Sequence, residues 1–319
     1  MKFLKIIIAV LLTFLMLYVT RQNSRGRSEY YTHSENGYAF EMYTVPKVNE
    51  YESDTIVLTV TMPPESKAQL WFLSSEMEHY TQRKQKPYTE IPMAQLDSAA
   101  HTYASVVTAG PRGGRLYYYF EVIDAAGKTR ATFKPPDGKP FLLKYIGRVP
   151  IWIVVLHITF LFATVFCVSM ATVNTFAAMS SGKSLRPAMV FIFWAVLFTF
   201  LGMIPFGIPM NYYAFDVTWE AVPFGTDATD NKTQLIFFYL LFVLLAGWKS
   251  FRGKGRDIYP PKTLAIFTVG AFFVMMFIYL IPHSIQFSET LTYAFCYGFI
   301  ALVVFLYLTG YCKKEKKAV

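Results

Sequence analysis

Hydrophobic residues follow two different patterns along the chain. Residues 3–20 and 149–312 contain long stretches that are almost entirely apolar. Between them apolar and polar residues alternate, as at Leu58-Thr59-Val60-Thr61. Alternation with a period of two predicts half-buried β-strands, whereas long apolar stretches predict membrane helices. The change of pattern near Arg148 is therefore a domain boundary.

The apolar stretches have lengths suited to a lipid bilayer. A bilayer core about 30 Å thick is crossed by a helix of about 20 apolar residues. The stretches that reach or approach this length are 3–20, 149–179, 187–210, 233–248, 264–281 and 291–312. The predicted fold class is a polytopic α-helical membrane protein with six transmembrane helices and an all-β domain. The first stretch is an anchor or, alternatively, a cleaved signal peptide, although no small-x-small cleavage site follows it.

Lysine and arginine indicate how these helices are oriented, because they accumulate in short cytoplasmic loops. They gather in segments that alternate along the chain, at 2–5, 183–186, 249–262 and 313–317. The intervening loop 211–232 has Lys232 as its one basic residue. This pattern predicts a multi-pass cell-membrane protein with both termini inside and residues 28–145 outside. It also accounts for the net charge of +9, so nucleic-acid binding is not expected.

The region between the apolar blocks predicts a β-sandwich. Its clearest strand is 116–122, which Gly113-Gly114 introduces and the turn 124–127 ends. Short strands separated by turn residues are typical of sandwiches. The three cysteines, Cys167, Cys296 and Cys312, all lie in apolar stretches. The β domain therefore has no disulfide and depends on its core alone.

Three runs in this region carry a family resemblance: 91–93, 103–105 and 114–127. Together they resemble the second half of an immunoglobulin-like or fibronectin-III-like module, over about residues 50–145. Such modules are common in bacterial extracytoplasmic proteins, so the resemblance implies a sandwich outside a bacterial inner membrane. It says nothing about function. The expected organisation is an anchor 1–20, a linker 21–37, a β-sandwich 38–147, a five-helix bundle 148–312 and a basic tail 313–319.

The second apolar stretch carries small residues at a spacing of four, which brings them onto one helix face. Small residues allow membrane helices to approach closely. We expect this stripe to pack against helices of the same chain or of a membrane protein partner. Its members are Thr159, Ala163, Cys167, Ala171 and Thr175.

A pocket at the outer face is suggested by the end of the third stretch and by one histidine. Residues 202–210 contain Pro205 and Pro209, which should break the helix, and broken backbone at membrane depth needs shelter. His157 lies about 12 Å below the outer end of its helix. Either it bonds a neighbouring helix, or it ligates a metal or haem. His283 is a poorly matched second haem ligand but could line the pocket.

The loop 211–232 combines aromatic residues with carboxylates. Asp216, Glu220, Asp227 and Asp230 could together hold a divalent cation, since oxygen ligands suit Ca²⁺ or Mg²⁺. In that hypothesis Trp219 and Phe224 pack the loop down. Plainer alternatives are aromatic anchoring at the membrane interface, capping of the next helix by Asp227 or Asp230, and a solvated pair of Asp230 with Lys232.

No phosphate-binding, metalloprotease or serine-hydrolase motif is present. The sequence therefore favours a non-enzymatic membrane component whose outer domain binds or scaffolds a partner, most simply without a cofactor. The alternatives are a small permease or channel subunit, and an electron-transfer subunit that carries haem or a metal. Helix interiors free of charged residues argue against a proton-coupled transporter.

Overall fold

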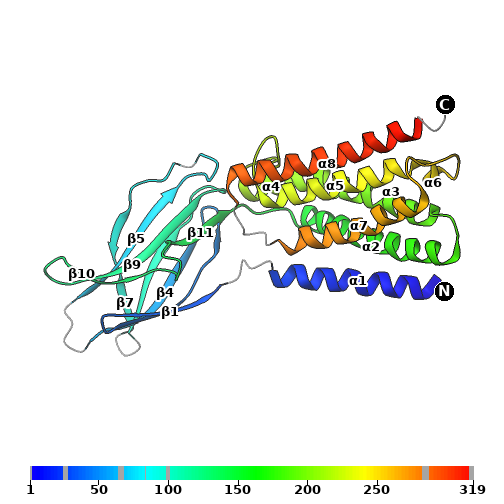
Figure 1. The fold of residues 1–319 in the computed structure, drawn as a ribbon. Helices are drawn as coiled ribbons and strands as arrows, with labels where there is room; N and C mark the ends of the chain where they lie inside the picture. Colours follow the sequence, from blue (N-terminus) through cyan, green and yellow to red (C-terminus); the bar gives the residue numbers. More distant parts are fainter. Residues whose placement is uncertain are drawn as a thin grey trace. The chain divides into compact units, whose positions relative to one another are not determined.

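The computed structural model describes residues 2–23, 28–63, 68–82, 84–97, 101–281 and 287–315. The chain divides into two compact units. The β unit comprises Gly26–Val149 and Asn211–Val217, and the helical unit comprises Met1–Arg25, Pro150–Met210 and Thr218–Val319. A β-rich region followed by a largely helical one is the order that the sequence predicts (Figure 1).

The β unit contains two sheets packed against a shared core (Figure 1). The first has the order β1-β2-β4-β8-β7 and the second β3-β11-β9-β5-β6, with β10 pairing to β9. Only β3 with β11 is parallel among the described pairs. The strands are β1 (Tyr30–Glu35), β2 (Tyr38–Tyr43), β3 (Lys47–Asn49), β4 (Ser53–Thr61), β5 (Gln69–Met77), β6 (Thr89–Pro92), β7 (Ala94–Asp97), β8 (Thr102–Thr108), β9 (Arg115–Ile123), β10 (Thr129–Phe133) and β11 (Phe141–Ile146).

The core of the β unit follows from the period of two. In β9 the even-numbered residues, including Tyr118 and Phe120, are buried, whereas the odd-numbered residues are half-buried. Phe120 lies 5.7 Å from Phe72 and 6.0 Å from Phe133, measured between ring centroids. This interlocked aromatic core stabilises the unit without a disulfide.

One strand lies where we expected a linker. Tyr30–Glu35 forms β1 and pairs with β2 through a tight hairpin. Asn36 and Gly37 at its turn have φ of 51° and 82°. Two consecutive positive φ values are what a two-residue hairpin turn requires, and Asn-Gly is its strongest sequence signal. The β unit therefore begins before residue 38.

The helical unit contains α1 and α2 in contact with α7, and α5 packed against α3, α7 and α8 (Figure 1). Its apolar core runs through these helices. The elements are α1 (Lys2–Asn23), α2 (Ile151–Ser181), α3 (Arg186–Leu201), the π-helix η1 (Gly202–Gly207), α4 (Ile208–Phe215), α5 (Ala228–Ala246), α6 (Trp248–Arg252), α7 (Pro261–Leu280) and α8 (Glu289–Glu315).

Six membrane spans are not supported. In the described chain four helical segments are long and apolar enough: Ile151–Ser181, Arg186–Phe215, Pro261–Leu280 and Glu289–Lys314. The apolar part of α1, Phe3–Val19, is shorter. Helix α5 begins with polar residues that include Asp230, Asn231 and Lys232, all buried. Because α5 packs among α3, α7 and α8, protein rather than lipid surrounds these side chains.

The predicted break after residue 201 is also wrong. The helix continues through Pro205 as η1 and then as α4, up to Phe215. A π-helix shifts its hydrogen bonds to a wider turn, which accommodates the missing N–H of a proline. The backbone therefore stays helical where the sequence suggested unwinding.

Candidate functional site

His157 and the π-helix are brought together, as the pocket hypothesis requires. The Nδ1 atom of His157 lies 2.9 Å from the carbonyl oxygen of Gly202. Since a carbonyl can only accept, Nδ1 donates this hydrogen bond. The side chain thus links α2 to η1, which is the bonding alternative stated above. Pro205 is exposed and Pro209 half-buried, while His283 falls outside the described residues.

Asp227 and Asp230 hold the loop before α5 instead of facing a common ion. Asp227 is the N-cap, and its Oδ1 accepts from the backbone N–H groups of Thr229 at 2.7 Å and Asp230 at 3.1 Å. Asp230 is buried, and its Oδ2 accepts from the N–H of Glu220 at 2.8 Å. The Asp227 bonds satisfy helix-terminal donors that would otherwise lack partners, and the Asp230 bond fixes the loop to the helix.

The next residues of α5 complete this network. The side chain of Asn231 accepts from the N–H of Val222 at 3.1 Å, and that of Gln234 donates to the carbonyl of Val222 at 2.9 Å. The Lys232 ammonium donates to the carbonyl of Ile281, just after α7. Asn231 is buried. The first turns of α5 therefore organise both the preceding loop and the end of α7.

Asp216 belongs to the other unit. In the β unit it forms a 2.8 Å ion pair with Arg112, whose guanidinium lies 4.7 Å from the ring centre of Tyr212. The Asp216 hydrogen bond raises the pKa of Arg112 and keeps it charged. His79 Nε2 lies 2.8 Å from the carbonyl oxygen of Phe215, to which it donates. Residues 211–217, which we call the docked segment, are thus held by side chains of the sandwich.

Two glycines make room for the docked segment. The N–H of Gly147 donates to the carbonyl of Ala214 at 2.9 Å. A Cβ at Gly147 would lie 2.0 Å from the carbonyl oxygen of Tyr213. A Cβ at Gly113 would lie 2.6 Å from that of Phe215. Any larger residue at either position would displace the segment.

Asp216, Asp227 and Asp230 therefore have structural roles in an ion pair or in hydrogen bonds to the backbone. Among the residues that the structure describes, no three His, Cys, Asp or Glu side chains could hold one metal ion. Trp219 is half-buried, but Phe224 is 80% exposed and does not pack the loop down. A cation on this loop stays a prediction, now without a preformed cluster in the described chain.

The small-residue stripe of α2 is partly buried within the helical unit and partly exposed on its surface. Cys167, Ala171 and Thr175 are buried within the helical unit, whereas Thr159 is exposed and Ala163 half-buried. The buried three form a packing seam inside the chain. Only the first two remain accessible to a partner helix.

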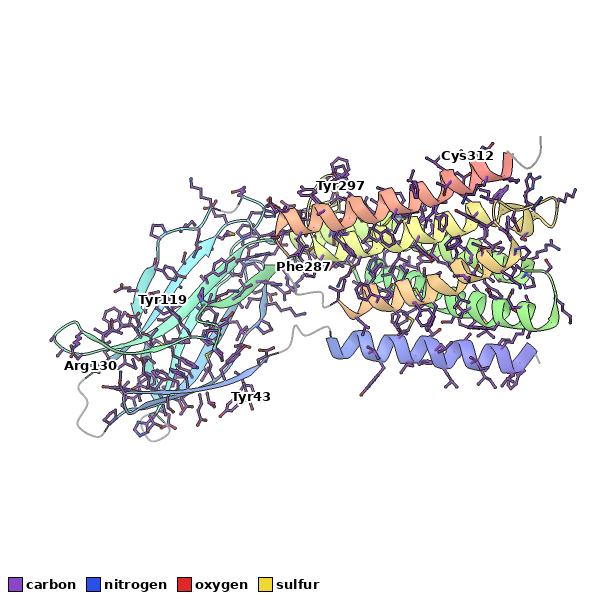
Figure 2. All side chains as sticks on the ribbon, viewed as in Figure 1. Tyr43, Tyr119, Arg130, Phe287, Tyr297 and Cys312 are labelled. Carbon is purple, nitrogen blue, oxygen red and sulfur yellow. The ribbon has the colours of Figure 1, made fainter. Side chains whose placement is uncertain are left out.

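An aromatic surface that the sequence reasoning missed lies on the outer face of the second sheet. Residues paired across antiparallel strands share a face. Leu73 pairs with Tyr119, and Tyr117 pairs with both Ser75 and Leu142. Tyr88 packs edge-on against Tyr119 at 5.4 Å (Tyr119 is labelled in Figure 2). We call Trp71, Tyr88, Tyr117, Tyr119 and Leu142 the outer aromatic face. The sequence signal for this face was that aromatic or apolar residues occupy odd-numbered as well as even-numbered positions of 116–122.

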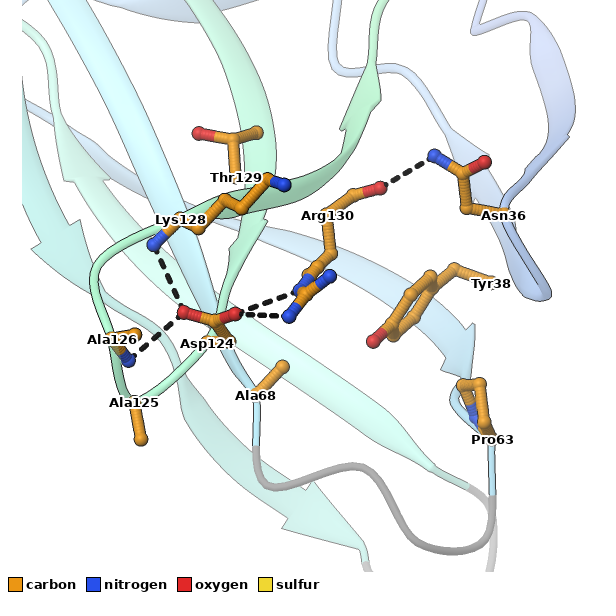
Figure 3. Close-up of a pocket in the computed structure, with 10 residues that line it drawn as sticks. All are labelled: Asn36, Tyr38, Pro63, Ala68, Asp124, Ala125, Ala126, Lys128, Thr129 and Arg130. Carbon is orange, nitrogen blue, oxygen red and sulfur yellow. Dashed lines mark hydrogen bonds and ion pairs between the residues drawn. The ribbon is translucent and has the colours of Figure 1, made fainter.

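The β unit also has an open groove of about 780 Å³ beside the β9–β10 turn (Figure 3). Asp124 organises this turn by accepting from the N–H groups of Lys128 and Ala126, both at 2.9 Å, and from Arg130 at 2.6 Å. The Lys128 bond, followed by that of Arg130, lowers the pKa of Asp124. Asn36 donates to the Arg130 carbonyl at 2.8 Å. The polar groups of this wall are thus paired with one another.

Neither a protein-family model nor a curated protein matches this chain. The two packed sheets are consistent with a β-sandwich, while the immunoglobulin-like resemblance stays a prediction. The functional argument therefore rests on the surfaces described above.

Proposed function

We propose that this chain is a multi-pass membrane protein whose β unit lies outside the cytoplasm and docks a protein partner through the outer aromatic face. The bundle anchors that domain in the membrane. The proposed function does not include a catalytic reaction. The β unit acts as an immunoglobulin-like binding or scaffolding module.

The outer aromatic face is the observation that carries partner binding. In a sandwich surrounded by water, outward positions are normally polar, because one face packs on the core and the other is solvated. Here a tryptophan, three tyrosines and a leucine occupy such positions, with Lys134 lying 4.1 Å from the Tyr119 ring centre. Tryptophan and tyrosine dominate the energetic centres of protein interfaces. This composition fits a protein surface as the ligand.

The distribution of charge supports the orientation. Basic residues follow α2 and α6 and precede α7, and they also end α8. The β unit joins the chain at the opposite ends, after α1 and before α2. Cytoplasmic enrichment of Lys and Arg then leaves both termini inside. In this arrangement α5 also traverses the bundle, with neighbouring helices covering its polar start.

Co-purification from membranes in a mild detergent tests the binding proposal. The double variant Tyr117→Ser/Tyr119→Ser should lower the yield of bound partner at least tenfold, as expected for losing two interface tyrosines. Tyr30→Ser/Tyr43→Ser, on the outer face of the other sheet, is the matched control and should retain the partner. Retention by the first variant, or loss only with the control, contradicts the proposal.

Orientation is tested with reporter fusions along the full chain. Fusions after Lys183 and Lys254 should report the cytoplasm, and one after Thr226 should report the outside. A cytoplasmic signal at Thr226 would contradict the orientation without affecting the binding test.

A further inference from the structure

A dense group of basic side chains surrounds the turn between α6 and α7. We define the basic collar as Arg186, Lys249, Arg252, Lys254 and Arg256, all of which are exposed. None of them forms a salt bridge within the described chain, where the recorded ion pairs lie in the β unit. The collar therefore presents uncompensated positive charge.

The turn brings these residues together by its backbone conformation. Gly253 and Gly255 have φ of 69° and 82°, a left-handed backbone conformation that favours glycine. A Cβ at Gly253 would lie 3.4 Å from Nε of Arg186, so that side chain lies over the turn. A Cβ at Gly255 would lie 3.4 Å from Cδ of Lys249. Residues from α3, α6 and the turn thus converge on one place.

The one nearby carboxylate is already used. Asp257 is the only acidic residue between 231 and 288. Its Oδ1 accepts from the N–H of Ser250 at 2.8 Å, and its Oδ2 accepts from the hydroxyl of the same serine. Asp257 therefore fixes the turn to α6 and is not placed to neutralise the collar through an ion pair.

The turn between α6 and α7 is also held in place by packing and by hydrogen bonds. Phe251 stacks on Phe193 of α3 with ring centroids 5.0 Å apart. Tyr259 donates to the carbonyl of Leu306, and Lys314 donates to that of Arg256 at 2.6 Å. Trp248 stands beside the collar and is 37% exposed. Basic residues next to an exposed tryptophan match the chemistry of a membrane interface, with phosphate above and hydrocarbon below.

We propose that the basic collar binds the phosphate of anionic phospholipids in the leaflet that surrounds it. The inference rests on the membrane placement proposed above. Lys and Arg offer charge-assisted hydrogen bonds to phosphate oxygens. Trp248 contacts the glycerol and upper acyl region of the same lipid. The partner is a lipid headgroup held at the protein, so a zwitterionic lipid of equal chain length binds more weakly.

The test uses the full chain purified in a neutral detergent. Added phosphatidylglycerol should raise the melting temperature by roughly 2–4 °C, because a ligand of the folded state stabilises it. Phosphatidylcholine with the same acyl chains should raise it much less. The variant Lys249→Gln/Arg252→Gln/Lys254→Gln/Arg256→Gln should lose the difference between the two lipids. The matched control Lys47→Gln/Lys84→Gln/Lys128→Gln/Lys139→Gln, in the β unit, should keep it.

Two results would overturn the inference: equal shifts with both lipids, or an equal, saturable shift with inorganic phosphate in place of lipid. If the fourfold variant does not fold, Lys249→Gln/Lys254→Gln should show a reduced preference, and an unchanged preference contradicts the collar. Release of the unmodified protein from membranes by alkaline carbonate would instead contradict the membrane placement. Retention through carbonate without a lipid preference would contradict the collar alone.

Discussion

The β unit and the helical unit differ in what lies outside their cores. In β4, buried Leu58 and Val60 alternate with Thr59 and Thr61, which contact solvent. In α8, exposed positions are themselves apolar: Leu302, Phe305 and Leu308 are 54%, 62% and 53% exposed. Water disfavours such an arrangement over a large area, whereas lipid does not. The outward residues of α8 are therefore suited to lipid, whereas those of β4 are suited to water.

The two units also differ in how their polar side chains are hydrogen-bonded. In the helical unit, several buried threonine hydroxyls bond within their own helix, as Thr172 does to the carbonyl of Val168 at 3.0 Å and Thr268 to that of Leu264 at 2.8 Å. In the β unit, polar side chains bond across turns, as Asp124 does. A hydroxyl buried in an apolar helical core finds its nearest acceptor in the carbonyl one turn earlier in the same helix.

The largest expected effect contrasts one phenylalanine in each unit. Phe120→Ala removes a fully buried ring from the aromatic core and should lower the free energy of unfolding of the β unit by about 3–5 kcal/mol. Phe305→Ala, on an exposed face of α8, should cost under about 1 kcal/mol, because removing an exposed ring leaves no packed cavity. Denaturant titration in detergent, followed by limited proteolysis of each unit, measures both. If Phe305→Ala lowered the free energy of unfolding more than Phe120→Ala, the contrast between a buried core ring and an exposed ring would be contradicted.

The next contrast uses two glycines. Gly147→Ala should destabilise the β unit by about 1–3 kcal/mol, because the added methyl overlaps the Tyr213 carbonyl and displaces the docked segment. Gly298→Ala, in α8, meets open space and should stabilise the helix by up to about 1 kcal/mol. Thermal melts of the two variants in one detergent give the comparison. Equal changes in melting temperature for the two variants would show that the docked segment is not held at Gly147.

A smaller effect separates capping from cation binding at Asp227. Asp227→Ala should cost about 0.5–2 kcal/mol, since the first turn of α5 loses its N-cap, and Asp227→Asn should cost less because asparagine also caps. Melting temperatures are measured with and without Ca²⁺ or Mg²⁺. If a cation raises the melting temperature and both variants abolish that rise, the loop is a metal site after all.

The smallest effect is a pH dependence of the β9–β10 turn. The pKa of Asp124 is lowered in the folded protein, so its contribution to stability is present above about pH 4. It is lost as the pH falls through the folded-state pKa, when the carboxyl is protonated and its bonds weaken. Asp124→Asn should therefore reduce the loss of stability that occurs as the pH falls. Melts of the β unit between about pH 5 and 3 check this, and an unchanged loss of stability would contradict the role of Asp124.

Local pattern accounted well for the strands and for most helices. Alternation at Leu58–Thr61 and the strand predicted at 116–122 correspond to β4 and β9. The local pattern missed β1, although Asn36-Gly37 carried the signal, because the surrounding residues are polar and exposed. The candidate site was predicted less well. His157 does meet residues 202–207. The carboxylates do not gather around one ion: Asp227 and Asp230 bond backbone groups at the start of α5 and Asp216 pairs with Arg112, and these contacts depend on the tertiary structure.

The sequence by itself determined the two kinds of region, the absence of a disulfide in the β unit and the clustering of basic residues at helix ends. These depend on composition and period, which are local. Only the tertiary structure decided that the helix continues through Pro205, that Asp216 pairs with Arg112, and that tyrosines at 117 and 119 share an outer face with Trp71. Each of these depends on strand register or on a contact between residues far apart in the chain. Such contacts are selected by the free energy of the whole packed unit and leave no mark in a short stretch of sequence.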